Sequence, residues 1–143
     1  MGLGSFVVNW CRDQRGGVAT EFAIIMPVFL LLVAGIMDFG HAWYMKQIIT
    51  MASREGARYG ARYETDGSGN RINHTITEIQ NYVTNNYADK LPADANLTVA
   101  ATTAGQNLTV TVNAVKTWFI LGMLVPGLGN SVNLAASTTM LIE

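Results

Sequence analysis

Residues 16–38 read GGVATEFAIIMPVFLLLVAGIMD, and no residue from Phe22 to Met37 carries a charge. A helix that spans a bilayer needs ~20 mainly apolar residues. At ~1.5 Å per residue, ~33 Å of helix separate Glu21 from Trp43, so that Trp43 and Tyr44 fit an interfacial aromatic belt. This stretch therefore predicts a single-span membrane protein and not a soluble enzyme.

The N-terminus has the reverse of the order expected for a secretory signal peptide, whose apolar core precedes its cleavage site. Here Arg12 and Arg15 come first, then two glycines, then the apolar run. Cleavage at the glycines would leave the hydrophobic helix on the mature protein, whereas an uncleaved signal anchor is the simpler alternative. The chain has one cysteine, so an intramolecular disulfide is excluded.

Glu21 stands at the head of the apolar run, where a carboxylate is costly. It either lies among head groups at the helix N-terminus, where the helix dipole favours it, or neutralises a cation when helices pack side by side. Cleavage after Gly16 would place Glu21 one helical turn from the free amine of Gly17. Pro27, inside the run, predicts a kink that either helps helices pack or has no function.

The string RGGVATEFAIIMP at 15–27 resembles the start of TadE-like proteins, which are minor pilins or pseudopilins of the tight-adherence branch of the type IV pilus machinery. The resemblance continues through Asp38-Phe39-Gly40 and through ASREGARY at 52–59, and the C-terminal half matches only in general style. A pseudopilin of a type II secretion system is a near relative, but the ASREGAR string favours the TadE-like family.

The resemblance implies that a prepilin peptidase cuts after Gly16, ahead of Gly17. The family places a glutamate and an aromatic residue, here Glu21 and Phe22, at this distance from the cut. With Pro27, these two residues are the predicted helix-packing positions for assembly. The resemblance also implies a cytoplasmic leader and an external head, in agreement with the basic residues that precede the span.

Beyond the membrane, the helix is predicted to continue as Lys46 to Tyr63, with two opposite faces. The small residues Ala52, Gly56 and Gly60 form a smooth stripe that permits close approach of a sheet or a second helix. The basic stripe contains Arg54, Arg58 and Arg62. These arginines either contact lipid head groups or a partner's carboxylates, or form a solvated face with a Glu55–Arg58 pair.

The remainder is predicted to be a small α+β head. Residues 64–70 read as a loop, and Ile72, Ile76, Ile79 and Val83 mark an amphipathic helix ending near Tyr87. Thr75 and Glu78 have capping-box spacing, although the helix can also begin at Asn70. Alternating residues predict strands at 97–101, 108–114 and 132–140, with a hairpin turn at 104–106.

The segment WFILGMLV at 118–125 is too short to span a bilayer and too apolar to hang free in water. We expect it to pack in the core under the sheet. The alternative is an exposed patch for another subunit or for the membrane surface.

Asp38 and His41 lie three residues apart on one helix face, and both are expected to meet water or lipid head groups. The sequence has no zinc spacing, calcium loop or phosphate-binding motif, so that no catalytic residue, cofactor or metal is predicted. From Glu64 onward, three Lys/Arg stand against six Asp/Glu, which argues against nucleic acid binding.

The predicted organisation is a leader at 1–16, a transmembrane helix with its extension at 17–63, and a periplasmic or extracellular α+β head at 64–143. The resemblance implies a minor pilin-like subunit of a tight-adherence pilus assembly or secretion system in the bacterial inner membrane, acting in pilus biogenesis or adhesion. Its implied partners are other pilins or pseudopilins, the pilus assembly platform, the prepilin peptidase and membrane lipid. Incorporation into a pilus stays open. The alternative function is a membrane-tethered binding module that is neither processed nor part of a filament.

Overall fold

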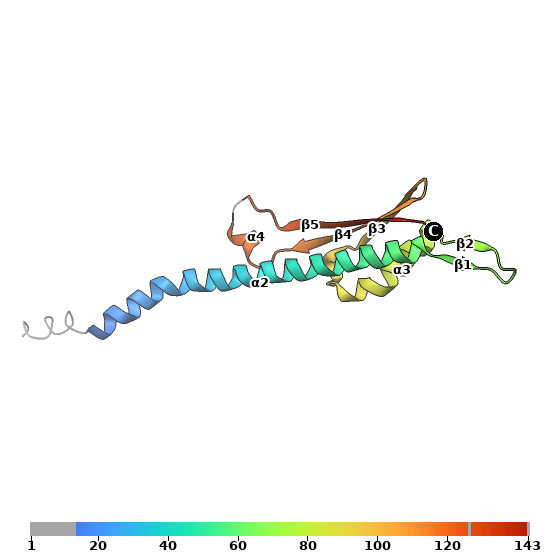
Figure 1. Cartoon of the computed structure of the whole chain (residues 1–143). Helices are drawn as coiled ribbons and strands as arrows, with labels where there is room; N and C mark the ends of the chain where they lie inside the picture. Colours follow the sequence, from blue (N-terminus) through green and yellow to red (C-terminus); the bar gives the residue numbers. More distant parts are fainter. Residues whose placement is uncertain (1–13, 126, 143) are drawn as a thin grey trace, which may run out of the picture. The chain divides into compact units, whose positions relative to one another are not determined.

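The computed structural model describes residues 14–125 and 127–142, and the chain divides into two compact units between Met37 and Asp38 (Figure 1). The second unit begins inside the segment predicted as transmembrane helix and extension, because the last part of the long helix packs against the head. The predicted limits of leader, helix and head stay predictions.

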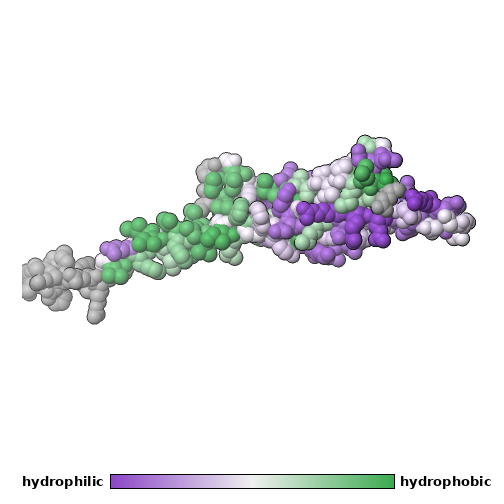
Figure 2. All heavy atoms as spheres, in the orientation of Figure 1, coloured by the Kyte–Doolittle hydropathy of each residue, from purple (hydrophilic) through white to green (hydrophobic). Residues whose placement is uncertain are grey.

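Helix α2, Gln14–Ala61, is 48 residues long and continues through Pro27. Its most apolar window has a mean hydropathy of 2.4, and only 11% of that window is buried. The helix therefore fits a single-pass membrane anchor, because a core helix of a soluble protein would be mostly covered. Figure 2 shows hydrophobic residues over most of the visible surface of α2 in the first unit. The helix ends at Ala61, slightly before the predicted end at Tyr63.

The second unit contains a three-stranded antiparallel sheet of order β3-β4-β5. Its strands are β3 (Thr98–Ala104), β4 (Asn107–Thr117) and β5 (Ser131–Leu141). Gly105 adopts a positive φ of 62° in the two-residue turn that joins β3 to β4, as a tight hairpin requires. The predicted fold class, a long N-terminal helix with a small helix and a three-stranded sheet, is confirmed.

The core lies between one face of this sheet and the helices α2 and α3 (Figure 1). Alternate residues of the central strand point into it, as period-two alternation predicts: Leu108, Val110, Val112, Ala114 and Lys116. Polar contacts join α2 to β5: Ser53 Oγ lies 2.9 Å from Thr138 Oγ1, and Lys46 donates to the carbonyl of Ala135. These contacts fix the helix against the sheet.

Helix α3, Ile76–Tyr87, starts with the predicted capping box. The Thr75 hydroxyl accepts from the Glu78 N–H, and the Glu78 carboxylate accepts from the Thr75 N–H at 2.8 Å. That backbone hydrogen bond, with a smaller contribution from the Thr75 side chain, lowers the pKa of Glu78 below its usual value. The alternative start of the helix at Asn70 is therefore wrong.

The segment before α3 is a β-hairpin where the sequence predicted a loop at 64–70. Strands β1 (Tyr63–Thr65) and β2 (Arg71–Asn73) pair antiparallel, and the Asp66 carboxylate accepts from the N–H groups of Ser68 and Asn70 in the turn. Ile72 lies in β2 and is exposed, so it does not extend the apolar face of α3. Two short 3-10 helices, η2 (Ala88–Lys90) and η3 (Ala93–Ala95), connect α3 to β3.

Replacing Gly60 with alanine should destabilise the second unit. A Cβ there would come closer than 3 Å to Ile79 and Leu108, whereas a Cβ at Gly40 in the same helix meets nothing within 4 Å. Overpacking costs ~1–3 kcal/mol, more than the up to ~1 kcal/mol that alanine gains in helix propensity. Thermal unfolding of the detergent-solubilised chain should show a lower midpoint for Gly60→Ala and an equal or higher one for Gly40→Ala. Equal midpoints for the two variants would contradict the packing argument.

Candidate functional site

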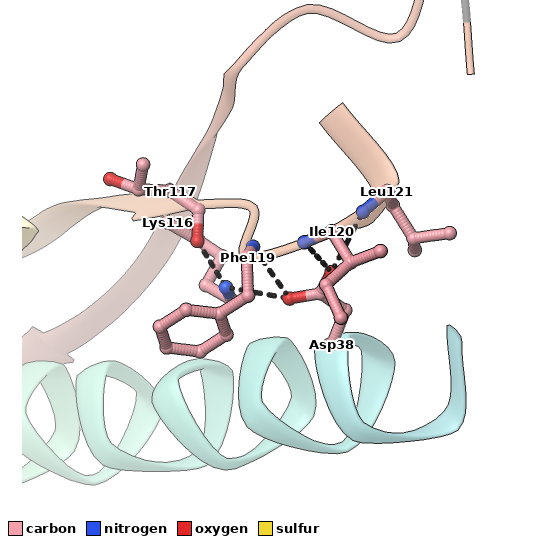
Figure 3. A network of polar contacts seen from close by, with 6 residues as sticks. All are labelled: Asp38, Lys116, Thr117, Phe119, Ile120 and Leu121. Atoms are coloured by element: carbon pink, nitrogen blue, oxygen red, sulfur yellow. Dashed lines mark hydrogen bonds and ion pairs between the residues drawn. The ribbon is translucent and has the colours of Figure 1, made fainter. Parts of the chain in front are cut away.

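Asp38 is the first charged residue after the apolar run, and its side chain is 1% exposed. It lies on α2 beneath the segment that joins β4 to α4 (Leu121–Leu124), as Figure 3 shows. We expected this carboxylate to meet water or lipid head groups, and that expectation is wrong. The reason is that a segment about 80 residues later in the sequence folds over it and supplies hydrogen-bond donors.

Three successive backbone N–H groups donate to the Asp38 carboxylate. Phe119 donates to Oδ1 at 2.9 Å, while Ile120 and Leu121 donate to Oδ2 at 3.0 and 3.1 Å (Figure 3). Consecutive N–H groups in a turn form a concavity suited to an anion. The Asp38 carboxylate therefore holds the turn that leads into α4. The three N–H groups in return supply the hydrogen bonds that a buried carboxylate needs.

Lys116 supplies the opposite charge. It is the last inward-pointing residue of β4 and is 1% exposed. Its Nζ lies 3.3 Å from Asp38 Oδ1, donates to the carbonyl of Thr117, and lies 4.4 Å from the centre of the Phe119 ring. A buried charge is tolerated when it is paired and hydrogen-bonded. The pair therefore keeps charge inside the protein without leaving either group uncompensated.

His41 lies one turn further along α2, and its ring centre is 5.5 Å from that of Phe119. His41 Nδ1 and Trp118 Nε1 are buried without a hydrogen-bond partner among the described residues. His41 makes no hydrogen bond with Asp38 in the described part of the chain. The contacts of Asp38 therefore describe a structural clamp, and we find no proton relay between these two residues.

The apolar segment 118–125 does not pack under the sheet, and the expectation that it does is wrong. Phe119 is 73% exposed and Met123 is 93% exposed. The even-numbered side chains of β4 and the face of α2 already fill the core, so this segment is left at the surface. Figure 2 shows hydrophobic residues gathered at α4, whereas hydrophilic residues predominate over much of the visible remainder of the second unit.

The predicted smooth stripe lies in the core. Ala52, Gly56 and Gly60 are all buried. Gly56 faces Val83 of α3 and Val110 of β4, and a Cβ on Gly56 would come within 2.5 Å of Val83 Cγ2. The stripe is thus the line along which α2 approaches both α3 and β4.

The predicted basic stripe lies at the surface. Arg54, Arg58 and Arg62 are exposed. Arg58 Nη2 lies 2.9 Å from Glu55 Oε2, which is the pair anticipated for a solvated face. Such an exposed pair contributes a few tenths of a kcal/mol.

The predicted processing and assembly residues lie on α2 in the first unit. Gly17, Glu21, Phe22 and Pro27 are exposed on the helix, and Gly16 is part of it. Thr20 Oγ1 donates to the carbonyl of Gly17 at 2.8 Å. These residues and Asp38 belong to different compact units, so the structure does not bring them together into one site.

Among residues 14–125 and 127–142, no group of three or more histidine, cysteine, aspartate or glutamate side chains is arranged to hold a metal ion. The main feature that the sequence did not predict is the buried polar cluster around Asp38. One signal was present: Lys116 continues the alternation of Leu108, Val110, Val112 and Ala114, which places a charge on the inward face of β4.

A comparison with known protein families finds a match within α2. Residues 16–58 match the family described as TadE-like protein. Over this segment the chain is similar to TadE-like proteins. No curated protein and no solved structure shows significant similarity to the chain.

The TadE-like segment includes the glycine pair, Glu21, the acid of the clamp and most of the smooth stripe, but it ends before Lys116. The match associates this segment with the Tad pilus machinery, and the apolar part of α2 fits a membrane anchor.

Replacing Asp38 should destabilise the second unit more than replacing Lys116. Asp38→Leu leaves Lys116 as an uncompensated buried charge and three N–H groups unpaired, which should cost ~3–5 kcal/mol. Lys116→Met should cost less, because the carboxylate keeps its three N–H donors.

Urea unfolding of the full chain in detergent, followed by circular dichroism, measures both variants. Asp89→Leu, which changes an exposed acid in η2, is the control and should shift stability by no more than ~0.5 kcal/mol. An Asp38→Leu variant as stable as this control would show that the clamp does not hold the unit together.

Proposed function

We propose that this protein is a minor pilin-like subunit of a Tad pilus assembly system, anchored in the bacterial inner membrane by α2. The observation that carries the proposal is the match of residues 16–58 to the TadE-like family, which includes a glycine-glutamate spacing suited to a prepilin peptidase. In this proposal the N-terminus is cytoplasmic, the head is periplasmic, and the role is structural and not enzymatic.

The exposed apolar surface of α2 supports a role in assembly. Phe22 and the residues that follow it on the helix are largely exposed in the isolated chain, and the same surface can contact lipid in the membrane and neighbouring helices in a filament. Glu21, one turn from the amine that cleavage creates, would pair with the N-terminus of a neighbour where low dielectric strengthens the attraction. Partners in this scheme are other pilins or pseudopilins, the assembly platform and the peptidase.

Intact mass spectrometry of the protein from its native membrane tests the processing step. In cells that contain the prepilin peptidase, the mass should fall by residues 1–16, and in cells without the peptidase it should correspond to the full chain. Gly16→Leu should keep the full-length mass in both. A full-length mass of the unaltered protein in both cells would favour a membrane-tethered module that is not processed.

Glu21→Ala should separate processing from assembly. The variant keeps the glycine at the cut, so its mass should still fall, but cross-linking to pilus subunits should be lost because the helix lacks its charge partner. Glu64→Ala, which changes an exposed glutamate of β1, should leave both measurements unchanged. Cross-linking of Glu21→Ala at the level of the control would argue against the proposed role of this carboxylate.

A further inference from the structure

Residues 118–125, 127 and 128, which we call the apolar loop, present hydrophobic side chains to their surroundings. Its exposed members are Phe119, Ile120, Met123, Val125 and Leu128. No residue from Thr117 to Ile142 carries a charge, and the charge of Lys116, which precedes this run, is buried. An exposed apolar patch of this kind marks an interaction surface.

Hydrogen bonds hold the apolar loop at the end of the apolar run of α2, residues 22–37. The N–H groups of Phe119, Ile120 and Leu121 all bind the carboxylate of Asp38, which follows the run by one peptide bond in a continuous helix. The next residues of α2 carry exposed aromatic rings, and the ring centres of Phe39 and Trp43 lie 6.3 Å apart. The loop is thus held at the end of the apolar run, within about two helical turns of Trp43 and Tyr44.

Many backbone N–H groups of the apolar loop are hydrogen-bonded. This pairing suits a medium without water, where each unpaired polar group costs several kcal/mol. Besides the three N–H groups that bind Asp38, the backbone N–H of Trp118 donates to the carbonyl of Asn130, and further backbone N–H groups donate within the loop. These are Met123 to Ile120 O, Val125 to Leu121 O, and Leu128 to Val125 O. The charges of Asp38 and Lys116 are both buried beneath it.

We propose that the apolar loop inserts into the interfacial layer of the phospholipid bilayer that α2 crosses, and so seats the head on the membrane surface. Lipid is the occupant because the loop continues, through Asp38, directly from the apolar run of the anchor. The exposed side chains are apolar or aromatic, as in segments that lie at the boundary of head groups and acyl chains. This inference rests on anchoring by α2 and does not depend on peptidase processing or pilus assembly.

Site-specific fluorescence in vesicles tests the proposal. The full chain with Cys11→Ser receives Met123→Cys, and its thiol is labelled with an environment-sensitive dye. Met123 is 93% exposed, so the substitution disturbs no packing. Ser68→Cys, in the exposed turn of the β1–β2 hairpin, is the matched control. Both proteins are reconstituted into phosphatidylcholine–phosphatidylglycerol vesicles, with or without lipids that carry a quencher near the head groups.

The dye at position 123 should emit at shorter wavelength than the dye at position 68, and lipid-borne quencher should reduce only the emission from position 123. Emission from position 123 that matches the control in wavelength and quenching would overturn the proposal. A short emission wavelength at position 123 that is lost when the protein is diluted with excess lipid would also overturn the proposal. That result would indicate that the loop contacts a second copy of the chain. Leu128→Cys repeats the measurement at an independent site.

Discussion

One buried carboxylate connects distant parts of the head. Asp38 binds Lys116 at the end of β4 and three N–H groups at the start of α4, so a single side chain joins segments about 80 residues apart. An unpaired charge at this depth would be strongly unfavourable. The partners of Asp38 are the last inward-pointing residue of β4 and the residues at which the chain turns away from the sheet, so both features meet at this charge.

A second constraint comes from the close approach of α2 to the sheet. Gly56 and Gly60 leave no room for a Cβ between α2 and its neighbours, and each faces one side chain from α3 and one from β4. The same helix is apolar on nearly all sides from Phe22 to Met37 and buries only one stripe after Asp38. One continuous helix therefore provides both the segment that fits a membrane anchor and the structural base of the head.

The sequence predicted the features that have a period or a local motif. The apolar run, the alternation of β4, the capping box at Thr75 and the TadE-like start are all local signals, and each lies where it was expected. The hairpin of β1 and β2 was missed because its residues are exposed and show no hydrophobic pattern. The partners of Asp38 were missed because no local spacing connects them, and the apolar loop because hydrophobic composition does not distinguish a protein core from an exposed surface.

The clamp also changes the effective length of the anchor. The 16 uncharged residues from Phe22 to Met37 give ~24 Å of helix, which is shorter than the ~30 Å hydrocarbon core of a bilayer. Because Asp38 is buried under the apolar loop, the next charged residue exposed on α2 is Lys46. The uncharged surface then extends past Trp43, to ~33 Å or more, which is sufficient to cross the core. In a bilayer the head would thus complete the anchor, because Lys116 and the N–H groups of residues 119–121 compensate the charge of Asp38 near the membrane edge.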